Sequence, residues 1–161
     1  MRTLPVAALP AAASLWLLLL VLAPVALSRG VAPLGTLAVY GSGSILCHQQ
    51  PERSFEVAGV QMPVCGRCFG LYLAGAAGAL AAFASGRRRR TAGVQAVRIA
   101  LAVAAAPILL SVGLEWTGVV AGSNASRFAS ALPLGAAGGW LLQQTIAAAG
   151  DRPDALSFRG V

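Results

Sequence analysis

The sequence predicts an all-α fold, an integral membrane bundle of about four transmembrane helices with an extracytoplasmic loop that carries cysteine and histidine. Three observations predict it. Of the 161 residues, 57% are hydrophobic and 11% are charged, whereas a soluble domain has about 25% charged residues. The mean hydropathy is +0.74. The charges cluster, so long uncharged windows separate them. A cytosolic enzyme, a disordered chain and a coiled coil are thereby excluded, and residues 1–161 are expected to form a single membrane domain.

The charge balance is strongly basic, with twelve arginines, no lysine and five acids for a net charge of +7. Four of the arginines form one run at 87–90, between two apolar stretches. Proteins bind single-stranded nucleic acid by stacking its bases on aromatic side chains, and this run contains no aromatic residue. Basic runs beside membrane spans instead fix topology or contact anionic headgroups. The expected partner is therefore the lipid bilayer, and no nucleic acid is expected.

The first element is the uncharged window 3–28, which predicts a span at about 6–28. A helix needs about 20 residues to cross ~30 Å of hydrocarbon. A cleaved signal peptide is the alternative, because Arg2 precedes the apolar run and residues 26–28 (Ala-Leu-Ser) are typical of a cleavage site. The apolar run is longer than a usual signal core, which favours a retained span.

The stretch 30–51 is also uncharged, but proline and glycine interrupt it, at Pro33, Gly35, Gly41 and Gly43. We expect a half-buried or re-entrant helix that leads to Cys47, because these residues disfavour a full helical crossing.

Three later windows predict further spans at about 69–86, 94–114 and 128–149, the second with one charge, Arg98, near its start. In lipid, backbone polar groups must be satisfied within the segment, so apolar runs of this length are expected to be helical. Small residues recur every four positions on two of these spans, which favours close packing of helices. They are Gly70, Ala74 and Gly78 on one span and Ala131, Gly135 and Gly139 on the other.

Sidedness follows from the arginines, because short loops rich in arginine stay in the cytoplasm. The run at 87–90 places the end of the span 69–86 inside, so the cysteines that precede this single crossing are expected outside. The tail 151–161 and the amino terminus are expected inside. The sequence therefore predicts a multi-pass protein of the plasma (inner) membrane with both termini cytoplasmic.

All three cysteines and the only histidine lie within the expected outer loop, 47–68. Cys47 and His48 are adjacent, and Cys65 and Cys68 follow in a C-x-x-C motif. Thiolates and imidazole are the ligands of tetrahedral zinc sites, so the four side chains predict a metal site, tentatively for zinc. If only one of the two adjacent residues reaches the ion, a water or Glu52 would complete an open site.

Three other interpretations of the cysteines compete with the metal site. Cys65 and Cys68 are expected at a helix start, where the helix dipole and Arg67 lower a thiol pKa, which is typical of a thiol–disulfide motif. No thioredoxin-like βαβ pattern surrounds them. A structural disulfide with one thiol left over, or thiols that only pack, are the remaining alternatives. Attachment of c-type haem is disfavoured because Phe69 follows Cys68 where a histidine is needed.

Four further charged side chains are candidates for a polar site near the cysteines. Arg53 and Arg67 could orient the ligands or bind an anionic headgroup, with a solvated loop face as the alternative for Arg53 and its neighbours. Glu115 is expected at the outer end of the third span, where an acid usually finds a partner. Arg127 is its expected counter-charge, either as a structural clasp or in a polar site shared with His48 and Arg53.

These motifs resemble the prokaryotic membrane-protein family known as domain of unknown function 2085. The resemblance rests on residues 47–49 (Cys-His-Gln), 51–55 (Pro-Glu-Arg-Ser-Phe) and 63–68 (Pro-Val-Cys-Gly-Arg-Cys), followed by Gly70 and Tyr72. It covers about 40–140 and implies a small multi-span inner-membrane protein. It brings no established activity.

The chain departs from the family pattern at Gly66, Phe69 and Ala74. An acid that the family places nearer Pro107 is replaced by Ser111, which leaves Glu115 as the candidate.

The function that these residues favour is a binding or structural role based on the metal site. Whether the protein is an enzyme stays open. One alternative is a membrane thiol–disulfide oxidoreductase that uses Cys65 and Cys68, and another is a metal-dependent reaction on a lipid-type substrate near Arg53, Glu115 and Arg127. A third is an accessory subunit of a membrane complex. The sequence contains no carboxylate pair, phosphate loop or Ser/His/Asp set.

Overall fold

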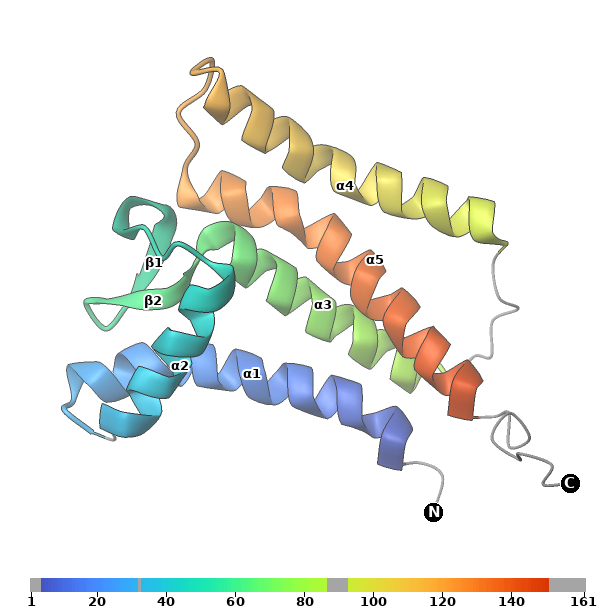
Figure 1. Cartoon of the computed structure of the whole chain (residues 1–161), viewed down its shortest axis with the longest axis horizontal. Coiled ribbons are helices and arrows are strands. Elements are labelled where there is room, and N and C mark those ends of the chain that lie inside the picture. Colours follow the sequence, from blue (N-terminus) through green and yellow to red (C-terminus); the bar gives the residue numbers. More distant parts are fainter. Residues whose placement is uncertain (1–3, 32, 87–92, 151–161) are drawn as a thin grey trace, which may run out of the picture.

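The structure is a computed structural model that describes residues 4–31, 33–86 and 93–150. Within these residues it is mostly helical (Figure 1), with α1 (Leu4–Ser28), α2 (Pro33–Leu46), α3 (Gly66–Ala84), α4 (Val94–Trp116) and α5 (Asn124–Gly150). Between α2 and α3 lie a 3-10 turn, η1 (Pro51–Arg53), and two strands, β1 (Ser54–Val57) and β2 (Val60–Cys65). The arginine run 87–90 and the tail 151–161, both expected in the cytoplasm, lie outside the described residues.

The long helices lie side by side in the order α1, α3, α5, α4. Figure 1 shows that α3 and α5 run in one direction and that α1 and α4 run in the other. The starts of α3 and α5 therefore lie at the same end of the molecule, beside the two strands. The end of α3 and the start of α4 lie at the opposite end.

Three helical segments within the described residues are long and apolar enough to cross a membrane: Val6–Ser28, Gly66–Ala84 and Val94–Trp116. They correspond to three of the four predicted spans. The fourth, α5, has 27 residues and is less apolar, because it carries Asn124, Arg127, Gln143 and Gln144.

α3 and α5 pack backbone against backbone. A Cβ atom at any of four glycines would lie less than 3.0 Å from a backbone oxygen of the facing helix, closer than real Cβ atoms come. They are Gly70 and Gly78 on α3 and Gly135 and Gly139 on α5. Close packing along these small residues is confirmed for this pair of helices.

A proline inside α1 creates a second link between helices. Pro10 has no N–H group, so the carbonyl of Val6, four residues earlier, loses its helical hydrogen bond. The side-chain Nε2 of Gln143 on α5 donates to this carbonyl at 2.8 Å. Gln143 is 1% exposed, so a buried amide satisfies the backbone group that the proline leaves free.

The expected loop 47–68 contains an antiparallel hairpin that the sequence did not predict. Ser54 of β1 lies opposite Cys65 of β2, and Val57 lies opposite Val60. The two turn residues, Ala58 and Gly59, have φ values of +53° and +74°, the left-handed backbone that two-residue hairpin turns require. The all-α expectation therefore describes the helices and omits this small sheet, which fixes the chain at the start of α3.

The helix expected between residues 30 and 51 is α2, which ends one residue before Cys47. Its 14 residues extend about 21 Å at 1.5 Å per residue, too short to cross a bilayer. Thr36, Val39 and Gly43 face the rest of the protein, whereas Leu37 is exposed.

Candidate metal centre

Three sulfur atoms come together where α2, β2 and α3 meet. The Sγ atoms of Cys47, Cys65 and Cys68 all lie within 4.8 Å of one another, and the three residues form a group able to hold a metal ion. Cys47 is buried, Cys65 and Cys68 are half-buried, and all three thiols are free. Thiolates bound to one tetrahedral zinc ion at ~2.3 Å are about 3.8 Å apart. Small side-chain rotations would bring these sulfur atoms to that separation, so the donor set fits a zinc-type ion.

Cys65 and Cys68 meet because the chain changes from strand to helix between them. Cys65 is the last residue of β2 and has extended backbone angles, φ −71° and ψ 165°. α3 begins at the next residue, so Cys68 lies in its first turn. The first N–H groups of a helix have no partner within it and stabilise a nearby negative charge. The motif thus places two thiols at the end of a helix that favours thiolates.

Cys47 reaches the same point from the end of α2. Its N–H donates to the carbonyl of Gly43 at 3.0 Å, which extends the helical hydrogen bonding by one residue. The N–H of Cys65 donates to the Sγ atom of Cys47 at 3.1 Å. Cys47 is therefore held against the strand that carries the second cysteine.

Gln49 holds α2 and β2 together beside the sulfur atoms. Its Nε2 donates to the carbonyls of Tyr40 on α2 and Pro63 on β2, each at 2.7 Å. The Nε2 of Gln61 in turn donates to the Gln49 carbonyl at 2.6 Å. Gln49 has a positive φ of +50°, a conformation that a non-glycine residue keeps only when its surroundings fix it. Sequence reasoning missed this clamp, although Gln49 directly follows the Cys-His pair.

The Cys65 thiol is acidic in this arrangement. Several hydrogen bonds together lower the pKa of Cys65 from 9.0 to about 5, against the opposing effect of partial burial. The largest contribution is the hydrogen bond with the Cys68 side chain, and the Cys68 and Arg67 N–H groups and Cys47 make smaller ones. The thiolate is the form that binds metal and attacks disulfides, so Cys65 is in its reactive form at neutral pH.

His48 is not brought into this group. Its side chain is exposed, and the metal-binding group found within the described residues consists of the three cysteines. Glu52, the other candidate for the fourth position, is also exposed. The donor set found within the described residues is therefore three sulfur atoms.

A cluster of ionic side chains lies next to the sulfur atoms and joins three helices. The carboxylate of Glu115 on α4 accepts from Arg67 Nη2 at 2.6 Å through one oxygen and from Arg127 Nε at 3.1 Å through the other. Arg67 also donates to the Ser111 hydroxyl at 3.2 Å. The three charged side chains are only 10–15% exposed. Two guanidinium groups share one carboxylate, so the cluster keeps a positive charge.

Arg127 also ties α5 to the loop before the hairpin. Its Nη1 donates to the Asn124 side-chain oxygen at 3.2 Å and to the Glu52 carbonyl at 3.3 Å. Asn124 Nδ2 donates to the Ser54 carbonyl at 2.8 Å, across 70 residues of sequence. Arg53, which the sequence grouped with these residues, is exposed.

Arg67 connects the ionic cluster to the cysteines, because it lies between Cys65 and Cys68. The sequence indicated Arg67 and Glu115 as separate candidates. It did not predict their ion pair, since they are 48 residues apart. It also missed Gly122, where a Cβ atom would lie within 3.0 Å of the Glu115 carboxylate. A side chain at this position would displace the Glu115 carboxylate, so the glycine lets the chain after α4 lie against the acid.

The chain belongs to the family described as "Predicted membrane protein (DUF2085)", whose profile matches residues 47–141, more than half of the sequence. The matched segment contains all three cysteines together with Arg67, Glu115 and Arg127.

Two curated relatives were found, both named as uncharacterized proteins. One, from Methanocaldococcus jannaschii, is 49% identical over 37 residues, which are 23% of this chain and 24% of that protein. The other, from Methanothermobacter thermautotrophicus, is 33% identical over 90 residues, 56% of this chain and 78% of that protein. The chain thus spans about a quarter of the first relative and most of the second. No solved structure matches the chain.

Proposed function

We propose that this membrane protein binds one zinc-type ion through the thiolates of Cys47, Cys65 and Cys68. The site would serve either to bind the metal or to stabilise the structure. The convergence of the three sulfur atoms within 4.8 Å carries the proposal. Because these cysteines lie directly after α2, at the end of β2 and in α3, a bound ion would tie all three elements together. Metal binding would then contribute directly to the stability of the hairpin end of the molecule.

The proposed setting is a bundle of four spans with the metal site at the extracytoplasmic face and both termini in the cytoplasm. The arginines at 87–90 support this orientation through the positive-inside rule. As the fourth span we propose α5, whose 27 residues extend about 40 Å. Its strongly polar residues are compatible with a span, since Arg127 is 8% and Gln143 is 1% exposed. α1 is proposed as a retained span, because Leu20 and Ala23 are buried in the same hydrophobic cluster as Cys47.

As the fourth ligand we propose either His48 or a water. His48 follows Cys47 directly and is exposed, so it is free to turn toward the ion, whereas a water in this position would leave an open, reactive site. Replacing His48 with alanine distinguishes an imidazole ligand from a water ligand. Metal content that falls in His48→Ala indicates an imidazole ligand, and unchanged content indicates water.

Elemental analysis of the protein purified in detergent tests the proposal. About one zinc-type ion per chain is expected, lost when Cys47, Cys65 or Cys68 is replaced with serine and kept in Glu56→Gln, an exposed position on β1. A folded protein that carries no metal after expression in zinc-supplemented medium would overturn it.

The acidic Cys65 thiol favours a second candidate, a membrane thiol–disulfide oxidoreductase. Cys65 would attack a substrate disulfide to form a mixed disulfide, and Cys68 would resolve it, releasing the reduced substrate and forming a Cys65–Cys68 disulfide. A mixed disulfide trapped on Cys65 in the Cys68→Ser variant would support this candidate. Failure to trap one from a reduced, metal-free protein would count against it. A role as an accessory subunit and a reaction on a lipid-type substrate stay predictions from the sequence.

A further inference from the structure

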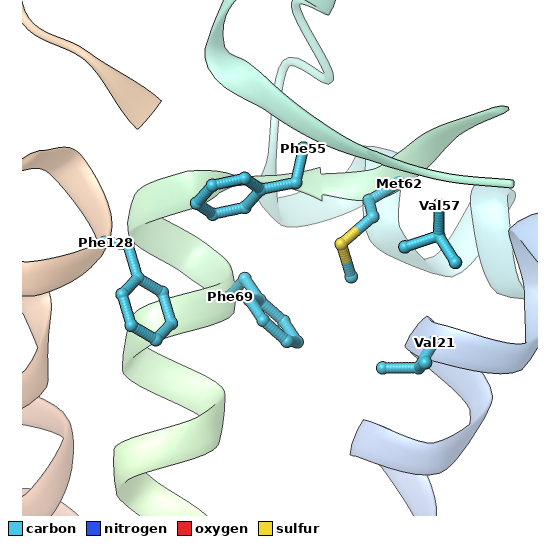
Figure 2. A pocket seen from close by; sticks show the side chains of 6 residues that line it. All are labelled: Val21, Phe55, Val57, Met62, Phe69 and Phe128. Atoms are coloured by element: carbon cyan, nitrogen blue, oxygen red, sulfur yellow. The ribbon is translucent and has the colours of Figure 1, made fainter. Parts of the chain in front are cut away.

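Beneath the hairpin lies a cavity of about 330 Å³ that is open to the outside and has an entirely apolar lining (Figure 2). Figure 2 shows side chains from the hairpin, α1, α3 and α5 around it. They are Phe55, Val57 and Met62 of the hairpin, Val21 of α1, Phe69 of α3 and Phe128 of α5. Its volume is at the lower end of the range of about 300–1,000 Å³ for small-molecule sites. A ligand in this cavity would be held by hydrocarbon and aromatic contacts alone.

Three phenylalanine rings form one wall of the cavity. The ring of Phe55 meets those of Phe69 and Phe128 nearly edge to face, with centroids 6.3 and 6.0 Å apart, and Phe69 and Phe128 are 5.7 Å apart. These are favourable separations for aromatic pairs. The rings come from the hairpin, α3 and α5, so their mutual contacts hold the wall in shape without a ligand.

The cavity is continuous with the surface of α1 that faces the bilayer. Val21 lines the cavity and is itself 37% exposed, and its neighbours Leu18 and Leu22 are 53% and 48% exposed. α1 is one of the helices apolar enough to span a membrane, so the hydrocarbon of the bilayer would contact these side chains. Apolar surface favours contact with apolar molecules over contact with water. Lipid chains are therefore the apolar molecules with access to this space.

We infer that the cavity binds one hydrocarbon chain of a membrane lipid, which enters past Val21 and ends under the hairpin against Val57 and Met62. Met62 and Phe69 also pack in the hydrophobic cluster that contains Cys47. A bound chain would thus contact side chains that support the sulfur atoms. The inference does not depend on metal binding, since it rests on the lining of the cavity and on its position beside α1.

Photolabelling of the full-length protein in phospholipid vesicles tests the inference. The probe is a phosphatidylcholine with a diazirine near the middle of one acyl chain, and mass spectrometry locates the labelled residues. Label is expected on Val57 and Met62, in addition to Leu18 and Leu22 on the outer surface of α1. Label confined to the outer surface would show that no acyl chain enters. A parallel experiment with a diazirine-bearing isoprenoid alcohol shows whether the bound hydrocarbon chain belongs to a phospholipid or to an isoprenoid lipid. Absence of label on the hairpin with both probes would overturn the inference.

Two substitutions that fill the cavity provide the matched comparison. Val21→Trp fills it from α1 and Val57→Phe fills it from the hairpin, and both are expected to abolish label on Met62 while label on Leu18 persists. Leu18→Trp introduces the same side chain one turn away on the lipid-facing surface and should leave Met62 labelled. Each variant is compared by thermal unfolding with the unchanged protein, so that a misfolded variant is recognised. Equal labelling of Met62 in a folded cavity-filling variant would contradict the inference, whatever the metal content.

Discussion

Arg67 and Glu115 form an ion pair of 2.6 Å, which ties the segment between Cys65 and Cys68 to α4. Arg127 of α5 contacts the other oxygen of the same carboxylate at 3.1 Å. One acid therefore holds two helices to the start of α3, where the sulfur atoms lie. Guanidinium groups suit this arrangement because their planar set of donors serves several acceptors at once.

Removing the acid should destabilise the protein strongly. Glu115→Gln keeps the shape of the side chain but leaves two guanidinium groups without a counter-charge. Breaking a fully buried ion pair costs about 3–5 kcal/mol, and because these side chains are 10–15% exposed we expect about 2–3 kcal/mol. Unfolding in detergent measures the change, with Glu56→Gln as a control for loss of an exposed negative charge. Equal stability of the two variants would contradict the clasp.

The close packing of α3 and α5 predicts opposite effects at adjacent glycines. A Cβ atom at Gly139 would meet the backbone of Gly75, whereas one at Gly138 would meet nothing within 4 Å. Gly139→Ala should therefore destabilise the bundle by about 1–3 kcal/mol. Gly138→Ala should be neutral or stabilising by up to about 1 kcal/mol, because alanine favours helix. Thermal unfolding of the two variants checks the difference, and the reverse order would exclude this helix packing.

Gln143 should contribute to the stability of the fold through its hydrogen bond to one backbone carbonyl, that of Val6. Gln143→Leu removes the donor to the Val6 carbonyl that Pro10 leaves free, but it also removes a buried side-chain oxygen that has no hydrogen-bond partner. The expected loss of stability is therefore small, about 1 kcal/mol. Gln144→Leu, at a half-buried neighbouring position, should change stability less. Restoring stability in Gln143→Leu by replacing Pro10 with alanine would identify the carbonyl as the cause.

The acidic Cys65 thiol predicts a pH dependence for the metal-free protein. Its pKa in the folded chain, about 5, lies below the ordinary value of 9.0, so ionisation stabilises the fold. This contribution is fully present above pH 9.0 and is lost as the pH falls through about 5. Alkylation of Cys65 by iodoacetamide after chelation should be half-maximal near pH 5 in the folded protein and near pH 9 after denaturation. A midpoint near 9 in both states would disprove the lowered pKa.

The long helices could be predicted from the sequence because they follow from long windows with at most one charge near the end. The predicted spans 6–28 and 94–114 correspond to α1 and α4, and the stretch before Cys47 corresponds to α2. The hairpin could not be predicted in the same way. Its turn is Ala58-Gly59, whereas Asn-Gly is the strong signal for a two-residue turn, and Pro63 within β2 argues against a strand. A two-stranded sheet tolerates the proline because each strand has an unpaired edge.

The candidate site could be predicted only in part, because only some of its residues are brought together by local spacing in the sequence. A C-x-x-C motif brings its two cysteines together locally, so Cys65 and Cys68 follow from spacing alone. Cys47 reaches them through the clamp of Gln49 across α2 and β2, which depends on tertiary structure. His48 is one residue away from Cys47 and yet exposed, because adjacent side chains after a helix end point in different directions. Clustering in the sequence therefore identified the loop that brings the three sulfur atoms together, whereas His48 lies outside this group in the structure.

X-ray absorption at the zinc edge of the purified protein tests the central claim most directly. The account predicts three sulfur scatterers about 2.3 Å from the zinc and no bound zinc in the variants Cys47→Ser, Cys65→Ser and Cys68→Ser. A fourth, lighter scatterer should be nitrogen or oxygen. Zinc bound without sulfur neighbours, or a metal-free protein with a disulfide between Cys65 and Cys68, would contradict the account.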